Sequence, residues 1–440
     1  MDTSSRLPLE LLLEVFRHYI SDRDIPVQSF DFSDGLWTLG QVNRTWRFAV
    51  LSDKSLWSTI NMAVNYPSHV NSTSSGVSAN LIFYDEMPMD EIHTIVPTPT
   101  TNQILAYILL RSKDMPLTIS LHFPTKNPDM ENVISSAWRP LFSVLLAEAH
   151  RLCTLDLVAP AQIWRDFANI PLARLPLLQK VDGTLPYIHD FFPVIQRCPD
   201  VSDLAVEVRY TDGSRDGGDT ISMPRLCKLE VSTARLLDAI TAPNLTSLIV
   251  MKKSLITSSS RVPPIVDFIR RSGCSLTNLE LHWNGTADEL FNVLPSMLTV
   301  ESLSFFHNSF EVAFDTRMKS VSSVLPRLRA FSLQRDVVVR HREHWVKKLD
   351  PFPDAIAVID VIECMLAGGI LESINVGLVV VDVLSEAARE RLSILNATPG
   401  VKVEIRQWSS DILAWSLYDR LDSVLDHLPS IRTGWSIHQR

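Results

Sequence analysis

A short apolar pattern that recurs along the chain constrains its fold more than any other feature. Each copy has an apolar residue, a second one three positions later and a third two positions after that, as in Leu152-x-x-Leu155-x-Leu157. Copies open at Leu152, Val201, Leu226, Leu245, Leu276, Leu328 and Leu371, with weaker ones at Leu178 and Val300 and a related stretch at residues 117–121. Because alternate side chains of a strand point to the same face, each copy predicts a short strand with one buried face.

Helical stretches lie between these strands, at residues 138–149, 264–271, 289–298 and 355–367. Successive strand patterns are mostly 19 to 31 residues apart, with a final step of 43. Strands and helices that alternate in this way indicate an α/β chain. The Leu-x-x-Leu-x-Leu core and its spacing resemble those of leucine-rich repeats, although the steps are irregular and the usual asparagines are missing.

This resemblance implies an irregular α/β solenoid, in which each helix closes back on the strands and neighbouring repeats share one elongated core. The strands that contain Leu155, Leu204 and Leu229 should then be parallel neighbours. The alternative is an ordinary α/β domain with a parallel sheet, which also alternates strands and helices. Nine similar strand cores without a nucleotide-binding motif favour the solenoid.

The first helix of the chain is unusually apolar. Pro8 suits the first turn of a helix, and a helical pattern follows over residues 9–20. Projected at 100° per residue, its apolar side chains span an arc of about 200°, whereas a surface helix needs a stripe of roughly 100° to seat on its own core. We therefore expect two sides of this helix to be covered, one by its own chain and the other by another chain.

A second helix is predicted to begin near Ser33 or Asp34, either of which suits an N-cap. Apolar residues then recur at spacings of three and four from Leu36 to Val50. After a turn, the apolar pair Leu56-Trp57 is expected to pack against them. Three short helical pieces within about fifty residues bury too little surface to be robust alone. Binding to a partner would stabilise them.

These residues resemble the F-box, in particular that of many fungal F-box proteins. The resemblance is carried in order by Leu7-Pro8-Leu9-Glu10-Leu11-Leu12-Leu13-Glu14-Val15-Phe16, by Leu39-Gly-Gln-Val42-Asn-Arg-Thr-Trp46-Arg47, and by Ser55-Leu56-Trp57. It implies a three-helix module that docks on the Skp-type adaptor of cullin-RING ubiquitin ligases. Two features depart from the family: the tract at residues 21–35 is longer than usual, and Asn43 stands where many members carry cysteine.

The resemblance also assigns roles to individual residues. Those that would contact the adaptor, or support the contact, are Leu7, Pro8, Leu12, Val15 and Phe16. Those that would build the hydrophobic centre of the module are Leu39, Val42, Trp46, Leu56 and Trp57. The alternative is that these segments are simply the opening helices of a helical domain.

The sequence thus predicts three parts. Residues 1–62 form the F-box-like adaptor-binding module, and residues 63–104, rich in serine, threonine and proline, form a linker or loop that is partly disordered. Residues 105–440 form the solenoid, which we expect to bind a target protein.

Net charge, hydropathy and cysteine content limit which partners and which cellular compartment we expect. The net charge of −9 argues against a nucleic-acid binder, which needs a basic face. No window approaches the roughly 20 apolar residues of a membrane-spanning helix, and the N-terminus lacks a secretory signal. The five cysteines are far apart in sequence and are expected to be free, buried thiols. These features predict a cytoplasmic protein, with the nucleus left open, that binds no membrane.

The sequence contains no evident catalytic, phosphate-binding or metal-binding motif. The Gly-rich phosphate-binding motifs and the Gly-x-Ser-x-Gly nucleophile motif are absent. Acidic residues alternate with others over residues 212–219, as in a calcium-binding loop, but the bidentate glutamate of such a loop is missing. His341 and His344 are spaced to bind a metal from one helix turn, but no third ligand is evident. We therefore predict no catalytic residue, no metal and no cofactor.

The leading hypothesis is a substrate-receptor subunit of a Skp–cullin–F-box-type ubiquitin ligase. The N-terminal module would bind the adaptor, and the solenoid would hold a target protein beside the ubiquitin-charged enzyme. The alternative is a non-catalytic leucine-rich-repeat scaffold without ligase association. A third class, an enzyme with a diverged site in the solenoid loops, has the least support.

Overall fold

The structure is a computed structural model of the 440-residue chain, and it forms two compact units. Unit 1 comprises Met1–Thr257 with Asp267–Cys274, and unit 2 comprises Ser258–Val266 with Ser275–Arg440. The residues that the structure describes are 7–21, 29–30, 32, 35–63, 99–123, 128–171, 175–210, 220–251, 263–283, 291–307, 321–334, 355–367, 371–380 and 386–407. The acidic tract at residues 212–219 and the His341–His344 pair lie outside these ranges, as do residues 64–98 of the predicted linker.

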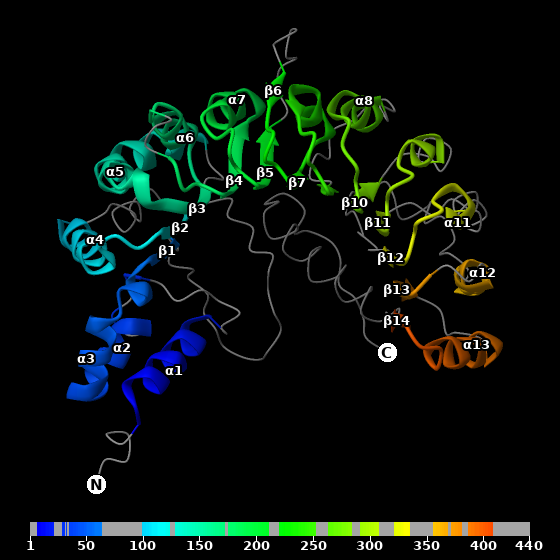
Figure 1. Ribbon diagram of the computed structural model, residues 1–440, viewed down its shortest axis with the longest axis horizontal. Helices are drawn as coiled ribbons and strands as arrows, with labels where there is room; N and C mark the ends of the chain where they lie inside the picture. The colour runs from blue at the N-terminus through cyan, green and yellow to red at the C-terminus, as the bar shows by residue number, and fades with distance from the viewer. Residues whose placement is uncertain are drawn as a thin grey trace, which may run out of the picture. The chain divides into compact units, whose positions relative to one another are not determined.

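Unit 1 begins with three helices and continues with strands and helices in alternation (Figure 1). In chain order its elements are α1 (Leu9–Ser21), α2 (Gly35–Val42), α3 (Arg44–Ser52), the 3₁₀ turn η2 (Lys54–Trp57), β1 (Thr59–Ala63), α4 (Pro99–Ser112), β2 (Leu117–His122), α5 (Pro128–Ala147), η4 (Ala149–Arg151), β3 (Leu152–Val158), α6 (Ala161–Ala168), β4 (Lys180–Tyr187), α7 (Ile188–Gln196), β5 (Asp203–Tyr210), β6 (Ile221–Ser222), β7 (Lys228–Val231), η6 (Ala234–Ala239), β8 (Ile240–Thr241) and β9 (Ser247–Val250).

The main sheet of unit 1 is parallel, in the order β1-β2-β3-β4-β5-β7-β9, and β6 pairs with β8 beside it. Equivalent positions of the apolar pattern stand side by side in a row: Ile119, Leu155, Val181, Leu204, Leu229 and Leu248. Every member of this row is buried. The parallel order predicted for the strands of Leu155, Leu204 and Leu229 is confirmed, with the strand of Val181 between the first two.

The weak copy of the pattern at Leu178 has a packing explanation. Its third position is Gly183, where the neighbouring strands carry Leu157 and Val206. The indole of Trp164, from α6, fills this space, so that a Cβ at Gly183 would overlap the ring. The indole N–H donates to the carbonyl of Thr184 at 3.1 Å, which fixes the ring there. The degenerate copy is therefore a site where a helix side chain replaces a strand side chain in the core.

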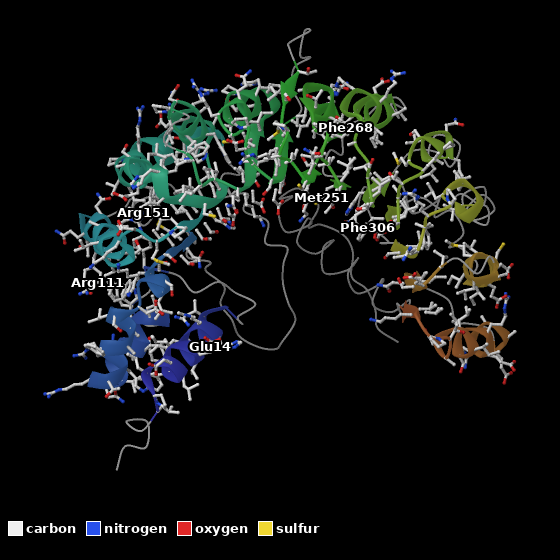
Figure 2. All side chains as sticks on the ribbon, in the orientation of Figure 1. Glu14, Arg111, Arg151, Met251, Phe268 and Phe306 are labelled. Carbon is white, nitrogen blue, oxygen red and sulfur yellow. The ribbon has the colours of Figure 1, made fainter. Side chains whose placement is uncertain are left out.

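A buried arginine joins the first repeats of unit 1. Arg151, the last residue of η4 and directly before β3, is labelled in Figure 2 and is 6% exposed. Its guanidinium donates to the Met115 carbonyl at 3.1 Å, to the Ser112 hydroxyl at 2.7 Å and to the Glu148 carboxylate at 3.0 Å. Because a buried charge is costly unless it is paired and hydrogen-bonded, this full set of partners allows Arg151 to link α4 to β3.

Unit 2 repeats the same alternation. Its elements are β10 (Asn278–Trp283), η7 (Leu294–Ser296), β11 (Ser302–His307), α11 (Val321–Val324), β12 (Ala330–Gln334), α12 (Ala355–Ala367), β13 (Ser373–Val380), α13 (Glu386–Asn396) and β14 (Val401–Gln407), and α8 (Pro263–Ser272) has residues in both units. The strands are parallel in chain order, with Leu279, Leu303, Phe331, Ile374 and Val401 in one buried row. The sequence pattern missed β14, because no apolar residue stands three positions before Val401.

The cysteines are free, as predicted, but only Cys198 belongs to the buried class. Burial raises the pKa of its thiol to about 12. The prediction of burial is wrong for Cys227, directly before β7, and for Cys364 on α12, which are exposed, because the residue type alone does not fix the face on which a side chain lies. Among the described helices, none is long and apolar enough to cross a membrane.

Candidate protein-interaction site

The apolar helix α1 buries one side against its own chain. Leu12 and Phe16, one turn apart, are 1% and 0% exposed. The ring of Phe16 meets that of Trp46 on α3 edge-to-face, with 5.1 Å between centroids. Aromatic pairs in this geometry contribute more than their buried area alone, so this contact seats α1 on α3.

A second apolar stripe on α1 and the turn before it is left open. It consists of Leu7, Leu11, Val15 and Tyr19, which are 45%, 55%, 53% and 37% exposed. Residues four apart lie one above the other on a helix, so these side chains form a continuous line, called the apolar stripe below. Scattered exposed apolar residues are common, whereas an aligned set of four is typical of a binding surface. The cover that α1 needs on its second side is absent from the described part of the chain.

The residues assigned to the adaptor contact by resemblance fall into two groups. Leu7, Pro8 and Val15 are exposed and accessible to a partner, whereas Leu12 and Phe16 are inside the module and support the surface from behind. The resemblance assigns no adaptor contact to Leu11 or Tyr19, which complete the exposed apolar stripe. The helical projection held the signal for them, because both fall on the same edge of the apolar arc as Val15.

Four of the five residues assigned to the hydrophobic centre are at least partly buried. Leu39, Leu56 and Trp57 are buried, and Trp46 is half-buried against Phe16. The assignment of Val42 to this centre is wrong, since its side chain is 54% exposed. The physical reason is a break in the helix directly after Val42.

Asn43 makes that break. Its backbone is extended, with φ −159° and ψ 179°, and its side-chain Oδ1 accepts a hydrogen bond from the Trp46 N–H at 2.9 Å, which caps α3. The single second helix predicted from the apolar spacing is therefore two helices, α2 and α3. Because the helical period restarts at the cap, a residue counted before it no longer shares a face with residues counted after it.

An ion pair fastens α1 to the end of α3. The Arg17 guanidinium donates to Asp53 Oδ2 at 2.6 Å, and Asp53 Oδ1 accepts from the N–H and the hydroxyl of Ser55 at 2.9 and 2.7 Å. Burial alone would raise the pKa of Asp53, but the hydrogen bonds from Ser55 and Arg17 outweigh it and hold the pKa below its usual value. The pair is one of the contacts that hold α1 against α3.

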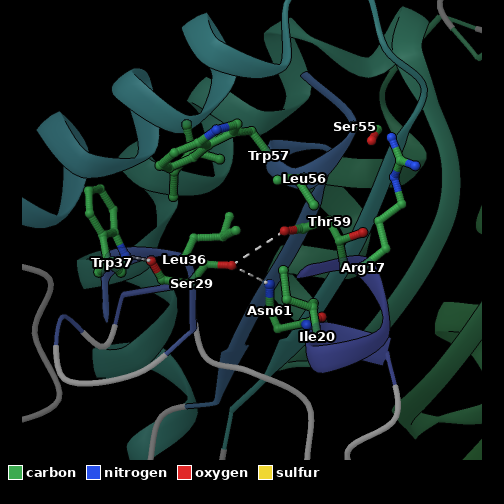
Figure 3. Close-up of a pocket in the computed structure, with 11 residues that line it drawn as sticks. Arg17, Ile20, Ser29, Leu36, Trp37, Ser55, Leu56, Trp57, Thr59 and Asn61 are labelled. Atoms are coloured by element: carbon green, nitrogen blue, oxygen red, sulfur yellow. Dashed lines mark hydrogen bonds between the residues drawn. The ribbon is translucent and has the colours of Figure 1, made fainter. Parts of the chain in front are cut away.

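Ser29, which lies in the tract between α1 and α2, covers the first edge of the sheet. The Ser29 N–H donates to the Asn61 carbonyl at 2.8 Å, and the Asn61 N–H donates to the Ser29 hydroxyl at 3.0 Å, so Ser29 occupies the free edge of β1 (Figure 3). The Trp37 indole donates to the Ser29 carbonyl at 2.9 Å. Part of the unusual insertion thus serves as an edge cover, which natural sheets need to avoid unwanted strand pairing.

Aromatic rings join the N-terminal module to the first repeat helix. Trp57 contacts Trp37 and Tyr107 of α4, with ring centroids 5.4 and 5.6 Å apart. A pocket of about 260 Å³ lies beside them, lined by Arg17, Ile20, Ser29, Leu36, Trp37, Ser55, Leu56, Trp57, Thr59, Asn61 and Ile108 (Figure 3). The module and α4 therefore share one core.

One cluster in unit 1 carries the residue types of a hydrolase triad. The Ser120 hydroxyl and His122 Nε2 both meet Asp156 Oδ2, at 2.7 and 2.8 Å, and Nε2 lies 3.3 Å from the hydroxyl. In a triad the carboxylate holds Nδ1 and leaves Nε2 to take the serine proton. Here the serine donates to the carboxylate itself, so it is not activated as a nucleophile. The described residues contain no group of three or more His, Cys, Asp or Glu side chains that could hold a metal ion.

Comparisons with known proteins give one family match, at the N-terminus, and a weak similarity to a solved structure. The F-box-like family model matches residues 4–63, so the chain begins with an F-box-like domain that ends in β1. Among solved structures, the chain is similar to the leucine-rich repeat-containing protein LegL7 from Legionella pneumophila, at 14% identity and a TM-score of 0.32, covering 62% of this chain and 87% of that one. A comparison with curated proteins gives no match.

Proposed function

We propose that this protein is the substrate receptor of a Skp–cullin–F-box-type ubiquitin ligase. The observation that carries the proposal is the apolar stripe, which stands open on α1 inside the segment matched by the F-box-like model. A helix that buries Leu12 and Phe16 completely and still exposes a second apolar line needs a partner for that line. A Skp-type adaptor is the partner that F-box-like domains generally bind.

The parallel-strand region supplies the second half of the function. Sheets with helices on one face leave the strands' other face available for contact, and repeat proteins use such surfaces to bind other proteins. In this proposal the chain acts by proximity, because it holds a target at high effective concentration next to the ubiquitin-charged enzyme. It needs no catalytic residue of its own.

Co-purification of the full-length chain with a Skp-type adaptor tests the proposal. The variant Leu11→Asp/Val15→Asp places two charges on the apolar stripe, and we expect at least about tenfold weaker association, because an unpaired charge in an apolar interface is costly. The matched control is Leu298→Asp/Ile394→Asp, which charges two exposed apolar residues of unit 2 (54% and 63% exposed) and should bind as wild type.

Both variants should melt at the wild-type temperature, since the four residues are exposed. Failure of the wild-type chain to associate with the adaptor would remove the ligase function and leave a repeat-based interaction protein. Equal loss in the stripe variant and the control would show that the stripe is not the contact.

A further inference from the structure

The tract at residues 64–98 separates two parts of unit 1 in the sequence. The segment matched by the F-box-like model precedes the tract and ends with β1 at Ala63, and the repeat helices and strands follow it from α4, which begins at Pro99. Few contacts cross a boundary at which two domains are joined by a hinge. Residues 1–63 and 99–257 nevertheless belong to one compact unit.

The first contact across the tract is a pair of parallel strands. β1 pairs with β2 over five residues, in a register that puts Ile60 beside Ile119. The Thr118 N–H also donates to the Ser58 carbonyl at 3.0 Å, directly before β1. Both isoleucines are buried, so β1 extends the buried row of the repeat strands by one member. The segment matched by the F-box-like model therefore contributes the first strand of the repeat sheet.

Trp57 is the centre of a second contact across the tract. Its side chain is 3% exposed, and its indole N–H donates to the Val50 carbonyl of α3 at 2.8 Å. The indole ring meets Trp37 of α2 (Figure 3) and Tyr107 of α4, both in edge-to-face geometry. Trp37 and Tyr107 also contact each other, with 6.0 Å between ring centroids. The three rings of Trp37, Trp57 and Tyr107 form one closed cluster, called the aromatic joint below.

Tyr107 is the member of the aromatic joint that follows the tract, and its own helix supports it. The guanidinium of Arg111, one turn later, lies over the Tyr107 ring at 4.9 Å from the centroid. Leu105 and Ile108 of α4 are 0% and 2% exposed, and Ile108 lines the same pocket as Trp57. Buried aromatic rings stabilise the contact between packed elements, because each removes a large apolar area from water. The joint therefore holds α4 against the segment that precedes the tract.

We propose that the tract at residues 64–98 is an insertion between the strand and the helix of the first repeat and does not act as a hinge. The aromatic joint and the β1–β2 pair hold α1 in one position relative to the sheet of unit 1, and the two parts stay together when the tract is cut. Because α1 carries the apolar stripe, a partner on the stripe keeps a constant separation from a partner on the sheet. The inference goes beyond the proposed function, since it depends only on contacts within the chain.

The test cuts the full-length chain inside the tract. A recognition sequence for a site-specific protease is inserted between Ser75 and Gly76, and the cleaved protein is analysed by gel filtration in native buffer. We expect both fragments to elute together at the volume of the uncut chain. Elution of the N-terminal fragment by itself would overturn the proposal. Co-expression of residues 1–75 and 76–440 from separate genes gives the same readout if the inserted sequence resists the protease.

Substitutions on α4 test whether the aromatic joint is the cause. In the cut protein, Tyr107→Ala removes one ring of the joint and should weaken the association of the fragments at least about tenfold, whereas Tyr107→Phe keeps the ring and should associate as wild type. The matched control Leu110→Ala is on the same helix, where the side chain is 70% exposed, and should leave the association unchanged. Circular dichroism of the uncut Tyr107→Ala chain should match wild type. Equal effects of Tyr107→Ala and Leu110→Ala would overturn the role of the joint.

Adaptor co-purification of the cut protein separates this inference from the proposed function. Retention of both fragments by the adaptor is the result expected if both proposals are correct. If the adaptor retains only residues 1–75, the inference about the joint fails and the ligase function stands. If the adaptor retains neither fragment while the two still elute together, the ligase function fails and the joint stands.

Discussion

His122 of β2 and Asp156 of β3 form an ion pair across two neighbouring strands of unit 1, with 2.8 Å between Nε2 and Oδ2. The Ser120 hydroxyl donates to the same carboxylate oxygen. The hydrogen bond to Asp156 raises the pKa of His122, against the opposing effect of burial. The carboxylate therefore holds a proton on the imidazole at a pH where a free histidine would have lost it.

This pair predicts a pH dependence. Because the pKa of His122 is higher in the folded chain than the ordinary value of about 6.5, its contribution to stability is complete below pH 6.5 and is lost as the pH rises through the folded-state pKa. We expect the His122 imidazole signal in an NMR titration to have a midpoint above 6.5, and Asp156→Asn to lower that midpoint. Ser120→Ala should leave most of the rise in place. A midpoint that Asp156→Asn does not move would contradict the assignment.

Gly183 offers a test of the core of unit 1. A Cβ there would overlap the Trp164 ring, so Gly183→Ala should destabilise the chain by about 1–3 kcal/mol through overpacking. Gly40 in α2 has no atom within 4 Å of an added Cβ, and Gly40→Ala should stabilise by about 0.5–1 kcal/mol. Urea unfolding followed by tryptophan fluorescence measures both. Similar midpoints for the two variants would show that Trp164 does not fill the space at Gly183.

Leu39 and Val42 lie one turn apart in sequence but differ in burial. Leu39 is 7% exposed, so Leu39→Ala should cost about 2–5 kcal/mol of stability. Val42→Ala should change stability by less than about 0.5 kcal/mol, because Val42 is at the surface. Thermal melts of the two variants decide the matter. A large loss of stability in Val42→Ala would show that Val42 does belong to the hydrophobic centre.

Asn43 is expected to contribute through its cap on α3. Asn43→Ala removes the acceptor for the Trp46 N–H and should cost about 1 kcal/mol, whereas Asn43→Asp keeps an acceptor and should be close to neutral. The comparison of the two variants in the same melt separates the cap from side-chain size. Equal losses would mean that the cap hydrogen bond contributes little.

Local pattern was sufficient for much of the fold. The row from Leu155 through Val181 and Leu204 to Leu229 follows from alternation within each strand, because one buried face per strand forces equivalent positions together. The apolar excess of α1 was also visible in its sequence, and it pointed to a surface that the described chain leaves open.

Tertiary structure decided the features that depend on contacts between distant residues. The apolar spacing continues through Asn43, but the helical backbone is interrupted there. The exposure of Val42 therefore follows from the position of the cap, which the apolar spacing does not reveal. Register likewise places Asp182 and Glu230 beside Ala205, across strands that are separated in the chain by long connections. Hydrophobic periodicity along one segment specifies which face is buried, whereas the neighbours of an outward-facing residue are set by how separate segments align in space.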